Sequence, residues 1–323
     1  YEIQLGDWSS DVCSSDLVNG LKTLLRGQSG IRKKYILKER AKRIGVIDVG
    51  GGQRAVYGAG VFDRCLDLGV QFDAAYGISA GSANVTSYLA GQRGRNHEYY
   101  TNYCLRKEYS SPGVFARTGS VIDLRYVYGT LSNSDGEYPL NFPGLMANPA
   151  PCTIVATDAE TGQAIYFGKE DMAQDDYRII MASCSVPVFC RPFPLNGRFY
   201  YDGAISDPVP IARAFADGCD AVVVILTRPK HYFRTDVHDR RQAKLMRRQF
   251  HGASRAFARR AATYNRELRR ALALERDGRV LIVAPDDIAG MKTFGKTPEA
   301  SEALYQKGLR DAAAIPAFIE KWR

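Results

Sequence analysis

The residues best suited to chemistry stand in the stretch Gly77-Ile78-Ser79-Ala80-Gly81, which ends an apolar run and precedes small residues able to start a helix. This Gly-x-Ser-x-Gly order is typical of a nucleophile elbow, a sharp turn from strand to helix that strains the backbone of its serine. Residues without bulk must flank that serine so that the chain can double back beneath it. We therefore predict Ser79 to be a nucleophile, with Gly77 and Gly81 as the glycines of its turn.

Two further segments offer what a nucleophilic serine needs. The run Gly50-Gly51-Gly52-Gln53-Arg54 follows an apolar stretch and can present consecutive backbone N–H groups at the start of a helix. Such donors would form an oxyanion hole for the tetrahedral intermediate of acyl transfer. Asp202 stands before Gly203 at the end of another apolar run, from which its carboxylate can reach the same rim.

The surrounding pattern predicts alternating strands and helices. A β-branched run over 44–49 indicates a buried strand, helical spacing follows to residue 68, a strand over 70–76 leads into the elbow, and a helix covers 80–90. Such alternation predicts a parallel sheet, in which sites form beyond the carboxyl ends of the strands. The glycine loop and Ser79 would both lie there.

Downstream, two apolar segments flank turn residues and predict a hairpin over 152–157 and 164–167. We expect a long surface loop over 132–151, which is rich in Ser, Asn, Gly and Pro. The other expected strands cover 197–202, 221–226 and 280–284, and the other expected helices cover 177–185, 208–216, 240–273 and 299–321.

In this order, the three chemical segments resemble the signatures of the patatin-like phospholipase family. That family carries Asp-Gly-Gly-Gly-x-Arg-Gly, then Gly-x-Ser-x-Gly, then Asp-Gly-Gly or Asp-Gly-Ala. The resemblance runs from about Ile44 to Leu226 and includes Ala182-Ser183 with the prolines that follow. Two positions depart from the family, since Val49 and Ala55 stand where it usually has glycine.

The resemblance implies a three-layer α/β/α hydrolase with a central, mostly parallel sheet, and no metal or cofactor. It implies that Ser79 attacks a carboxylic ester of a lipid and that Asp202 takes the proton, as a Ser–Asp dyad that forms an acyl-enzyme. Phospholipase A or lysophospholipase activity is the expected reaction. The oxyanion would be stabilised by Gly50, Gly51, Gly52 and Arg54.

The histidines of the chain leave a Ser–His–Asp triad open as an alternative to the dyad. The chain has four histidines, and three of them lie in one basic segment far along the sequence from the elbow. A Ser–His–Asp triad would require that segment to fold back over the site; otherwise the four are surface or helix-face residues. They are His97, His231, His238 and His251.

Two other functional classes stay open. The glycine run, read as Gly50-x-Gly52-x-x-Ala55, also fits a dinucleotide fingerprint, and Asp73 lies about the right distance along the chain to meet a ribose. A catalytically silent lipid-binding protein that merely keeps the fold is the third class. Replacement of Ser79 by alanine separates the classes, because lipid binding would survive it and hydrolysis would not.

The basic character of the chain belongs to one segment. The formal net charge is +9, and 16 Lys or Arg against 5 Asp or Glu stand between Arg228 and Arg279. This segment is either a solvated helical face or a surface for anionic lipid headgroups, with Phe250, Phe257, Leu268 and Leu272 as its apolar positions. We expect no nucleic acid partner, because no recognition motif accompanies the charge.

Length and composition predict an ordinary α/β protein. The 323 residues are 45% hydrophobic and 24% charged, which suits one large domain with additions. We expect a catalytic domain over 31–227 and a basic, mostly helical extension over 228–323. The oligomeric state cannot be read from this pattern.

The first 30 residues are set aside. Residues 7–17 resemble a sequencing adapter translated in one frame, and we treat 1–30 as such an artefact or as a polar disordered lead-in. The six later cysteines are scattered through apolar runs, which favours buried, reduced thiols. No stretch approaches the roughly 20 apolar residues of a membrane span. We expect a cytoplasmic protein, with peripheral membrane contact as an option.

Overall fold

A sheet of eight strands forms the centre of the computed structural model, which describes residues 41–294 and 297–323. The pairing order is β5-β6-β3-β2-β1-β7-β8, with β4 also paired to β3. All pairs among β3, β2, β1, β7 and β8 are parallel, and β4, β5 and β6 pair antiparallel. The strands are β1 Ile44–Asp48, β2 Ala74–Ile78, β3 Cys152–Asp158, β4 Ala164–Gly168, β5 Phe193–Leu195, β6 Arg198–Asp202, β7 Ala221–Ile225 and β8 Val280–Val283.

The central strands are apolar on both sides because both faces of the sheet are covered. Successive side chains of a strand point to opposite faces, so Val46 of β1 joins one core and Ile47 joins the other. In β7, Val223 and Val224 divide in the same way. A strand buried on both faces reads as a continuous β-branched run, as parallel strands usually do.

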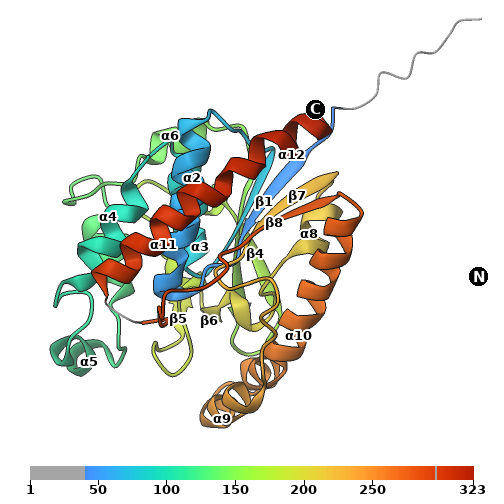
Figure 1. The fold of residues 1–323 in the computed structure, drawn as a ribbon. Helices are drawn as coiled ribbons and strands as arrows, with labels where there is room; N and C mark the ends of the chain where they lie inside the picture. Colours follow the sequence, from blue (N-terminus) through green and yellow to red (C-terminus); the bar gives the residue numbers. More distant parts are fainter. Residues whose placement is uncertain (1–40, 295–296) are drawn as a thin grey trace, which may run out of the picture. The chain divides into compact units, whose positions relative to one another are not determined.

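Helices cover the two faces and complete three layers. In Figure 1, α2, α3 and α11 lie on one side of the strands, and α8 and α10 lie on the other. The α/β/α architecture expected from the sequence is therefore present. The helices are α2 Val56–Asp67, α3 Ala80–Leu89, α4 Arg95–Thr101, α5 Pro112–Thr118, α6 Phe142–Ala147, α7 Arg178–Ser183, α8 Ile211–Ala216, α9 Val237–Met246, α10 His251–Arg276, α11 Pro298–Asp311 and α12 Ile315–Trp322.

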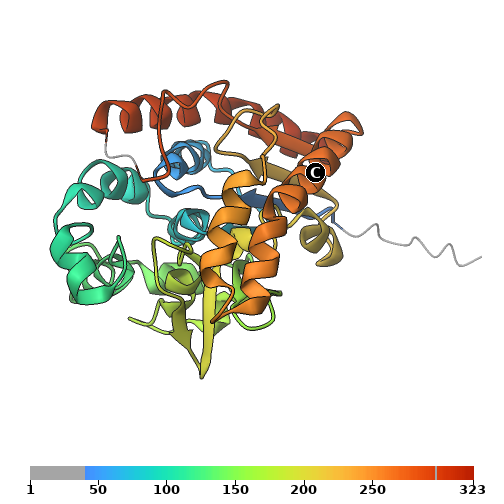
Figure 2. The same ribbon diagram turned by 90° about the horizontal axis from the view of Figure 1, so that it is seen from below.

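The segment after residue 227 is part of the same compact unit, which covers 41–323. It adds β8 to the sheet beside β7, and it lays α11 along α2. Figure 2 shows α9 and α10 side by side, as their contacts also indicate. The predicted apolar positions Phe250, Phe257 and Leu268 are buried in the cores, so they pack inward.

Several predicted bounds need correction. The second strand, β2 Ala74–Ile78, begins four residues later than expected. The single helix expected over 240–273 is two helices, with a break between Met246 and His251. The expected surface loop over 132–151 contains α6, whose Leu145 is fully buried. The short β5 was not foreseen. Residues 1–40, which include the stretch 7–17 and the start of the expected catalytic domain, lie outside the described residues.

The cysteines and the helix lengths bear on two further expectations. Cys65, Cys104, Cys152, Cys184, Cys190 and Cys219 are all buried, as predicted. Burial raises the pKa of Cys65 and of Cys152 to about 12, so these thiols stay protonated near neutral pH. Among the described residues, every helix is too short or too polar to traverse a bilayer.

Candidate active site

Ser79 sits in a strained turn between β2 and α3. Its backbone has φ 56° and ψ −132°, a conformation that residues other than glycine rarely adopt and that the surrounding structure must impose. A Cβ at Gly77 would lie 2.5 Å from Cα of Ser82, and one at Gly81 would lie 2.3 Å from the carbonyl oxygen of Asp48. Both flanking glycines are therefore required by close backbone approach.

Ser183 of α7 holds the turn from below. Its hydroxyl accepts the Ser79 N–H at 2.9 Å, donates to the Val155 carbonyl at 2.6 Å, and lies 2.8 Å from the hydroxyl of Ser82. The side chain is completely buried. One hydroxyl thus ties the elbow to β3 and to the first turn of α3.

Asp202 reaches Ser79 because two strands end head to head on one edge of β3. Residues 153–157 of β3 pair with β4, so β2 and β6 must share the opposite edge. On that edge Ile78, the last residue of β2, pairs with Val155, and Asp202, the last residue of β6, pairs with Ala156. β2 and β6 run in opposite directions along this edge of β3, so their carboxyl ends meet.

The carboxylate of Asp202 is buried in the cavity wall that also contains Ser79. Only 4% of the residue is exposed, and burial raises its pKa above the ordinary aspartate value. The Ser79 side chain, the Ala204 N–H, which donates to Asp202 at 2.8 Å, and the charges of Arg260 and Arg234 oppose this rise. Gly203 leaves room for the Val155 carbonyl, from which a Cβ would be 2.2 Å away.

The glycine loop adopts a conformation that side chains would resist. Gly50, Gly51 and Gly52 all have positive φ, of 64°, 128° and 62°, which is unfavourable for residues with a Cβ. The N–H of Gly50 donates to Asp48 Oδ1 at 2.8 Å, and the Gly50 carbonyl accepts from Thr227. Among the described residues, neither the Gly51 nor the Gly52 N–H has an acceptor, so these two are the donors left to meet a ligand.

Asp48 is a positioning residue that the sequence interpretation missed. Its fully buried carboxylate accepts the N–H of Gly50 and the side-chain amide of Asn84, each at 2.8 Å. Burial raises its pKa to about 6, and the two hydrogen bonds oppose that rise. A carboxylate at the end of a buried strand, one residue before a glycine run, is the signal that could have found it.

Arg54 lies under the loop with part of its guanidinium unsatisfied. It is 5% exposed, and Nη1 donates to the hydroxyl of Thr293 at 2.9 Å. Its buried Nε has no hydrogen-bond partner among the described residues. Burial, then the charges of Arg228 and Arg234, lower its pKa to about 9. Arg54 is still cationic at neutral pH, in a place where positive charge is unfavourable.

A cavity of about 350 Å³ opens beside these groups. Its wall includes Ser79, Asp202, the glycine loop and Arg54, together with many residues of the basic segment. That segment therefore does fold back over the site, as a triad would need. His238 lines the cavity, but no hydrogen bond joins it to Ser79 or Asp202. His97 instead lies 2.7 Å from Glu302 of α11.

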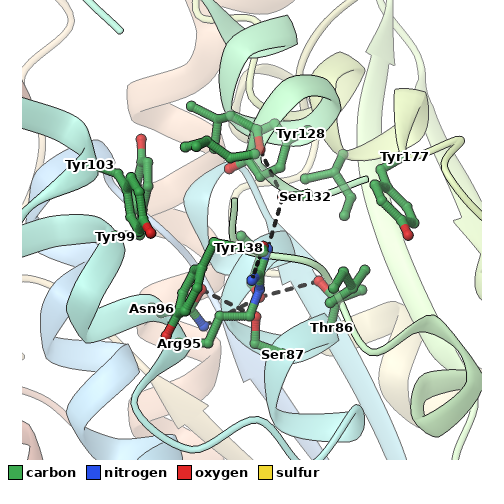
Figure 3. A pocket seen from close by; sticks show the side chains of 15 residues that line it. Thr86, Ser87, Arg95, Asn96, Tyr99, Tyr103, Tyr128, Ser132, Tyr138 and Tyr177 are labelled. Carbon is green, nitrogen blue, oxygen red and sulfur yellow. Dashed lines mark hydrogen bonds between the residues drawn. The ribbon is translucent and has the colours of Figure 1, made fainter. Parts of the chain in front are cut away.

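A small apolar crevice of about 30 Å³ opens on another side of Ser79. It shares the walls Tyr99 and Tyr128 with a second, tyrosine-rich pocket of about 30 Å³. Figure 3 shows this second pocket, with Arg95 reaching Ser132 at 2.8 Å. Ser79 thus stands between a polar cavity and an apolar crevice.

Asp73, the residue that a dinucleotide site would need for the ribose, lies far from the glycine loop. Asp73 precedes β2, and its carboxylate accepts the N–H of Ile44 at 2.8 Å, at the amino end of β1. The glycine loop follows β1 at the other end, about 15 Å away at the usual rise per residue of a strand. One bound dinucleotide would have to contact both ends of the sheet. The sequence spacing between the glycine run and Asp73 therefore does not correspond to a dinucleotide site in this fold.

Comparison with known proteins gives the following matches. A family model for patatin-like phospholipases matches residues 49–215, and a model for a domain of unknown function, DUF6363, matches 251–323. The uncharacterized protein YjjU of Escherichia coli K12 is 29% identical over 208 residues, which are 60% of this chain and 54% of that protein. This chain thus spans about half the length of that relative.

Two further matches cover a shorter segment or share a lower sequence identity. An uncharacterized NTE family protein of Mycobacterium tuberculosis is 34% identical over 79 residues, 24% of this chain and 20% of that protein. The crystal structure of VipD from Legionella pneumophila covers 85% of this chain and 66% of its own, at 13% identity and a TM-score of 0.44. Because the patatin model matches more than half of the residues, the chain belongs to the patatin-like phospholipase family.

Proposed function

We propose that this protein is a serine acyl hydrolase of the phospholipase A or lysophospholipase type, with Ser79 as nucleophile and Asp202 as base. Family membership supports action on lipid acyl esters in general. The observation that carries the finer proposal is the close approach of the Ser79 side chain to the buried Asp202, in one cavity wall where β2 and β6 meet. Such contact is what a Ser–Asp dyad requires.

The chemistry runs in two steps. Asp202 takes the hydroxyl proton while Ser79 Oγ attacks the ester carbonyl, and the same proton then passes to the departing alcohol, which leaves an acyl-enzyme. Water next gives a proton to Asp202 and attacks the acyl carbon, and Ser79 recovers its proton as the fatty acid leaves. The oxyanion of each tetrahedral intermediate would accept the N–H groups of Gly51 and Gly52, near the charge of Arg54.

Burial is the reason a carboxylate can act as this base. An ordinary aspartate, with a pKa near 4, is a weak acceptor for a serine proton. The raised pKa of Asp202 narrows that gap. The first carbons of the acyl chain would lie in the small apolar crevice beside Ser79, while the leaving group would occupy the larger polar cavity.

Fatty acid release from phospholipid and lysophospholipid micelles tests the proposal. We expect release by the wild type, loss by at least three orders of magnitude in Ser79→Ala, and unchanged release by Ser134→Ala, an exposed serine elsewhere. Micelle binding by Ser79→Ala should persist. A folded wild type that binds micelles yet releases no fatty acid would instead support the silent lipid-binding class.

We also propose peripheral contact with anionic membranes through α9. Val237 is 58% exposed and Leu245 is 74% exposed, and the exposed Arg241 shares their side of α9 at helical spacing. The exposed Arg248 follows shortly after the helix. Apolar side chains among cations suit an interface with anionic lipid. His238 and Asp239 of the same helix line the cavity, so such contact would bring lipid to the site.

Vesicle sedimentation tests this contact. Leu245→Asp should reduce binding to vesicles that contain anionic lipid several-fold. The control is Leu68→Asp, which changes an exposed leucine away from α9 and should not reduce binding. Equal and salt-insensitive binding of the wild type to neutral vesicles would remove the electrostatic part of the proposal.

A further inference from the structure

The cavity beside Ser79 contains more positive than negative charge. Four arginines line it, Arg54 from the glycine loop and the others from the segment after residue 227, against the two carboxylates of Asp202 and Asp239. The three arginines from the later segment are Arg228, Arg234 and Arg260. No signature of the catalytic segment singles out these three positions, and the mechanism above does not use them.

The two carboxylates do not neutralise the cluster. Asp239 accepts from Arg260, with Nε to Oδ2 at 3.0 Å, and Arg234 Nη2 lies 4.0 Å from its other oxygen. Arg228 and Arg54 have no carboxylate within ion-pair distance among the described residues. Two of the four guanidinium groups therefore lack an anionic partner.

The unpartnered groups are also partly cut off from water. The Nε atoms of Arg228 and of Arg54 are both buried without a hydrogen-bond partner in the described part of the chain. Buried polar atoms are usually satisfied, and an unsatisfied donor costs about 1–3 kcal/mol. Burial and mutual repulsion lower the pKa of Arg54 and of Arg234. An anion in the cavity would relieve both costs.

Aromatic side chains hold the cluster in position. The Arg228 guanidinium lies 4.2 Å from the ring centre of Tyr232, and that of Arg234 lies 5.6 Å from the ring centre of Tyr264. Both tyrosines also line the cavity. Stacked guanidinium groups lose less freedom when they bind, and their planar donors match the paired oxygens of a phosphate.

We propose that this cavity is a phosphate subsite, in which Arg228 and Arg234 bind the phosphate of a lipid substrate whose acyl ester lies at Ser79. The inference rests on the proposed function. In a glycerol phospholipid the phosphate is only a few bonds from the acyl ester, which suits a charged cavity and a nucleophile in one wall. Arg228 and Arg234 are thus the specificity-determining residues, supplied by the segment after residue 227.

The test compares two esters that differ only in the phosphate. They are 1-acylglycerol 3-phosphate and 1-acylglycerol with the same acyl chain, in the same neutral detergent. We expect the wild type to favour the phosphate ester in kcat/KM by at least about tenfold, and Arg228→Gln and Arg234→Gln each to reduce that ratio about tenfold. Arg270→Gln, an exposed arginine of α10 away from the cavity, should keep the ratio.

Binding separates failure of the subsite from failure of the hydrolase. With Ser79→Ala protein, calorimetry in the same detergent should show tighter binding of the phosphate ester than of the neutral one, and Arg228→Gln should abolish the difference. Inorganic phosphate should compete with the phosphate ester. Three results would overturn the proposal. The wild type could show no preference for the phosphate ester, or both arginine variants could keep the preference with unchanged melting temperatures. The protein could also bind inorganic phosphate but show no preference between the two lipids.

Discussion

At the scale of single residues, we propose that Asp202 transfers the proton and that no histidine takes part. His238 lines the cavity but does not bond to the dyad. We therefore expect Asp202→Asn to lower kcat/KM by about three orders of magnitude and His238→Gln to lower it less than about threefold. His251→Gln, exposed on α10, is the matched control. Comparable losses for Asp202→Asn and His238→Gln would indicate a triad.

The raised pKa of Asp202 predicts the acid side of the pH–activity profile. Only the ionised carboxylate can take the proton from Ser79, so kcat/KM should fall as pH drops through that pKa, above the ordinary aspartate range. The charge of Arg260 keeps this pKa from rising further. Arg260→Gln should therefore move the acid limb to higher pH, and a shift to lower pH would contradict the assignment.

Asp48 predicts a pH dependence of stability. Its pKa in the folded chain is about 6 against an ordinary value of 3.8, so folding favours the protonated acid. Its contribution is fully present below pH 4 and is lost as pH rises through about 6. The free energy of unfolding of the wild type, relative to Asp48→Asn, should thus fall by up to about 3 kcal/mol between pH 4 and pH 7. Asp135→Asn, an exposed carboxylate, should show no such trend in denaturant titrations.

At the scale of elements, the site depends on how α7 supports the turn between β2 and α3. Ser183→Ala leaves the buried Ser79 N–H without an acceptor, which costs about 1–3 kcal/mol of stability. It should also lower kcat/KM about tenfold or more, because the strained serine is no longer fixed. Ser185→Ala, which removes a buried hydroxyl bonded to Met181 at 2.8 Å, should cost stability without the same loss of rate.

The sequence predicted most of these elements because their signals are local. The elbow and glycine loop follow from residues that allow close approach and positive φ, and the strands follow from β-branched runs. The meeting of β6 with β2 could not be predicted, since it depends on the register of both strands along β3. The same limit hid the role of Ser183, whose partners Ser79 and Val155 are distant in the sequence.

At the scale of the whole molecule, the segment after residue 227 completes the site as well as the fold. Thr293 accepts the Gln53 N–H at 2.9 Å and bonds to Arg54, and the ring of Phe294 lies 4.3 Å from that of Phe189. The sequence showed this segment only as a basic helical addition. Which of its arginines face solvent and which face the cavity depends on packing, and composition does not encode it.

Two glycines fix that segment against the catalytic half. A Cβ at Gly308 of α11 would lie 2.1 Å from the carbonyl oxygen of Tyr57, and one at Gly60 of α2 would lie 2.2 Å from that of Tyr305. Gly308→Ala should therefore lower the free energy of unfolding by about 1–3 kcal/mol. Gly113→Ala, in α5, meets nothing closer than 3.8 Å and should be neutral or slightly stabilising in thermal denaturation. A stabilising Gly308→Ala would contradict this docking.

We propose that the Ser79 hydroxyl is the nucleophile and that Asp202 activates it. Labelling with a fluorophosphonate probe, followed by peptide mass analysis, tests it most directly. We expect the wild type to be labelled on Ser79, Asp202→Asn to be labelled far more slowly, and Ser79→Ala to remain unlabelled with its melting temperature preserved. Labelling of Ser79→Ala at the wild-type rate would contradict the account.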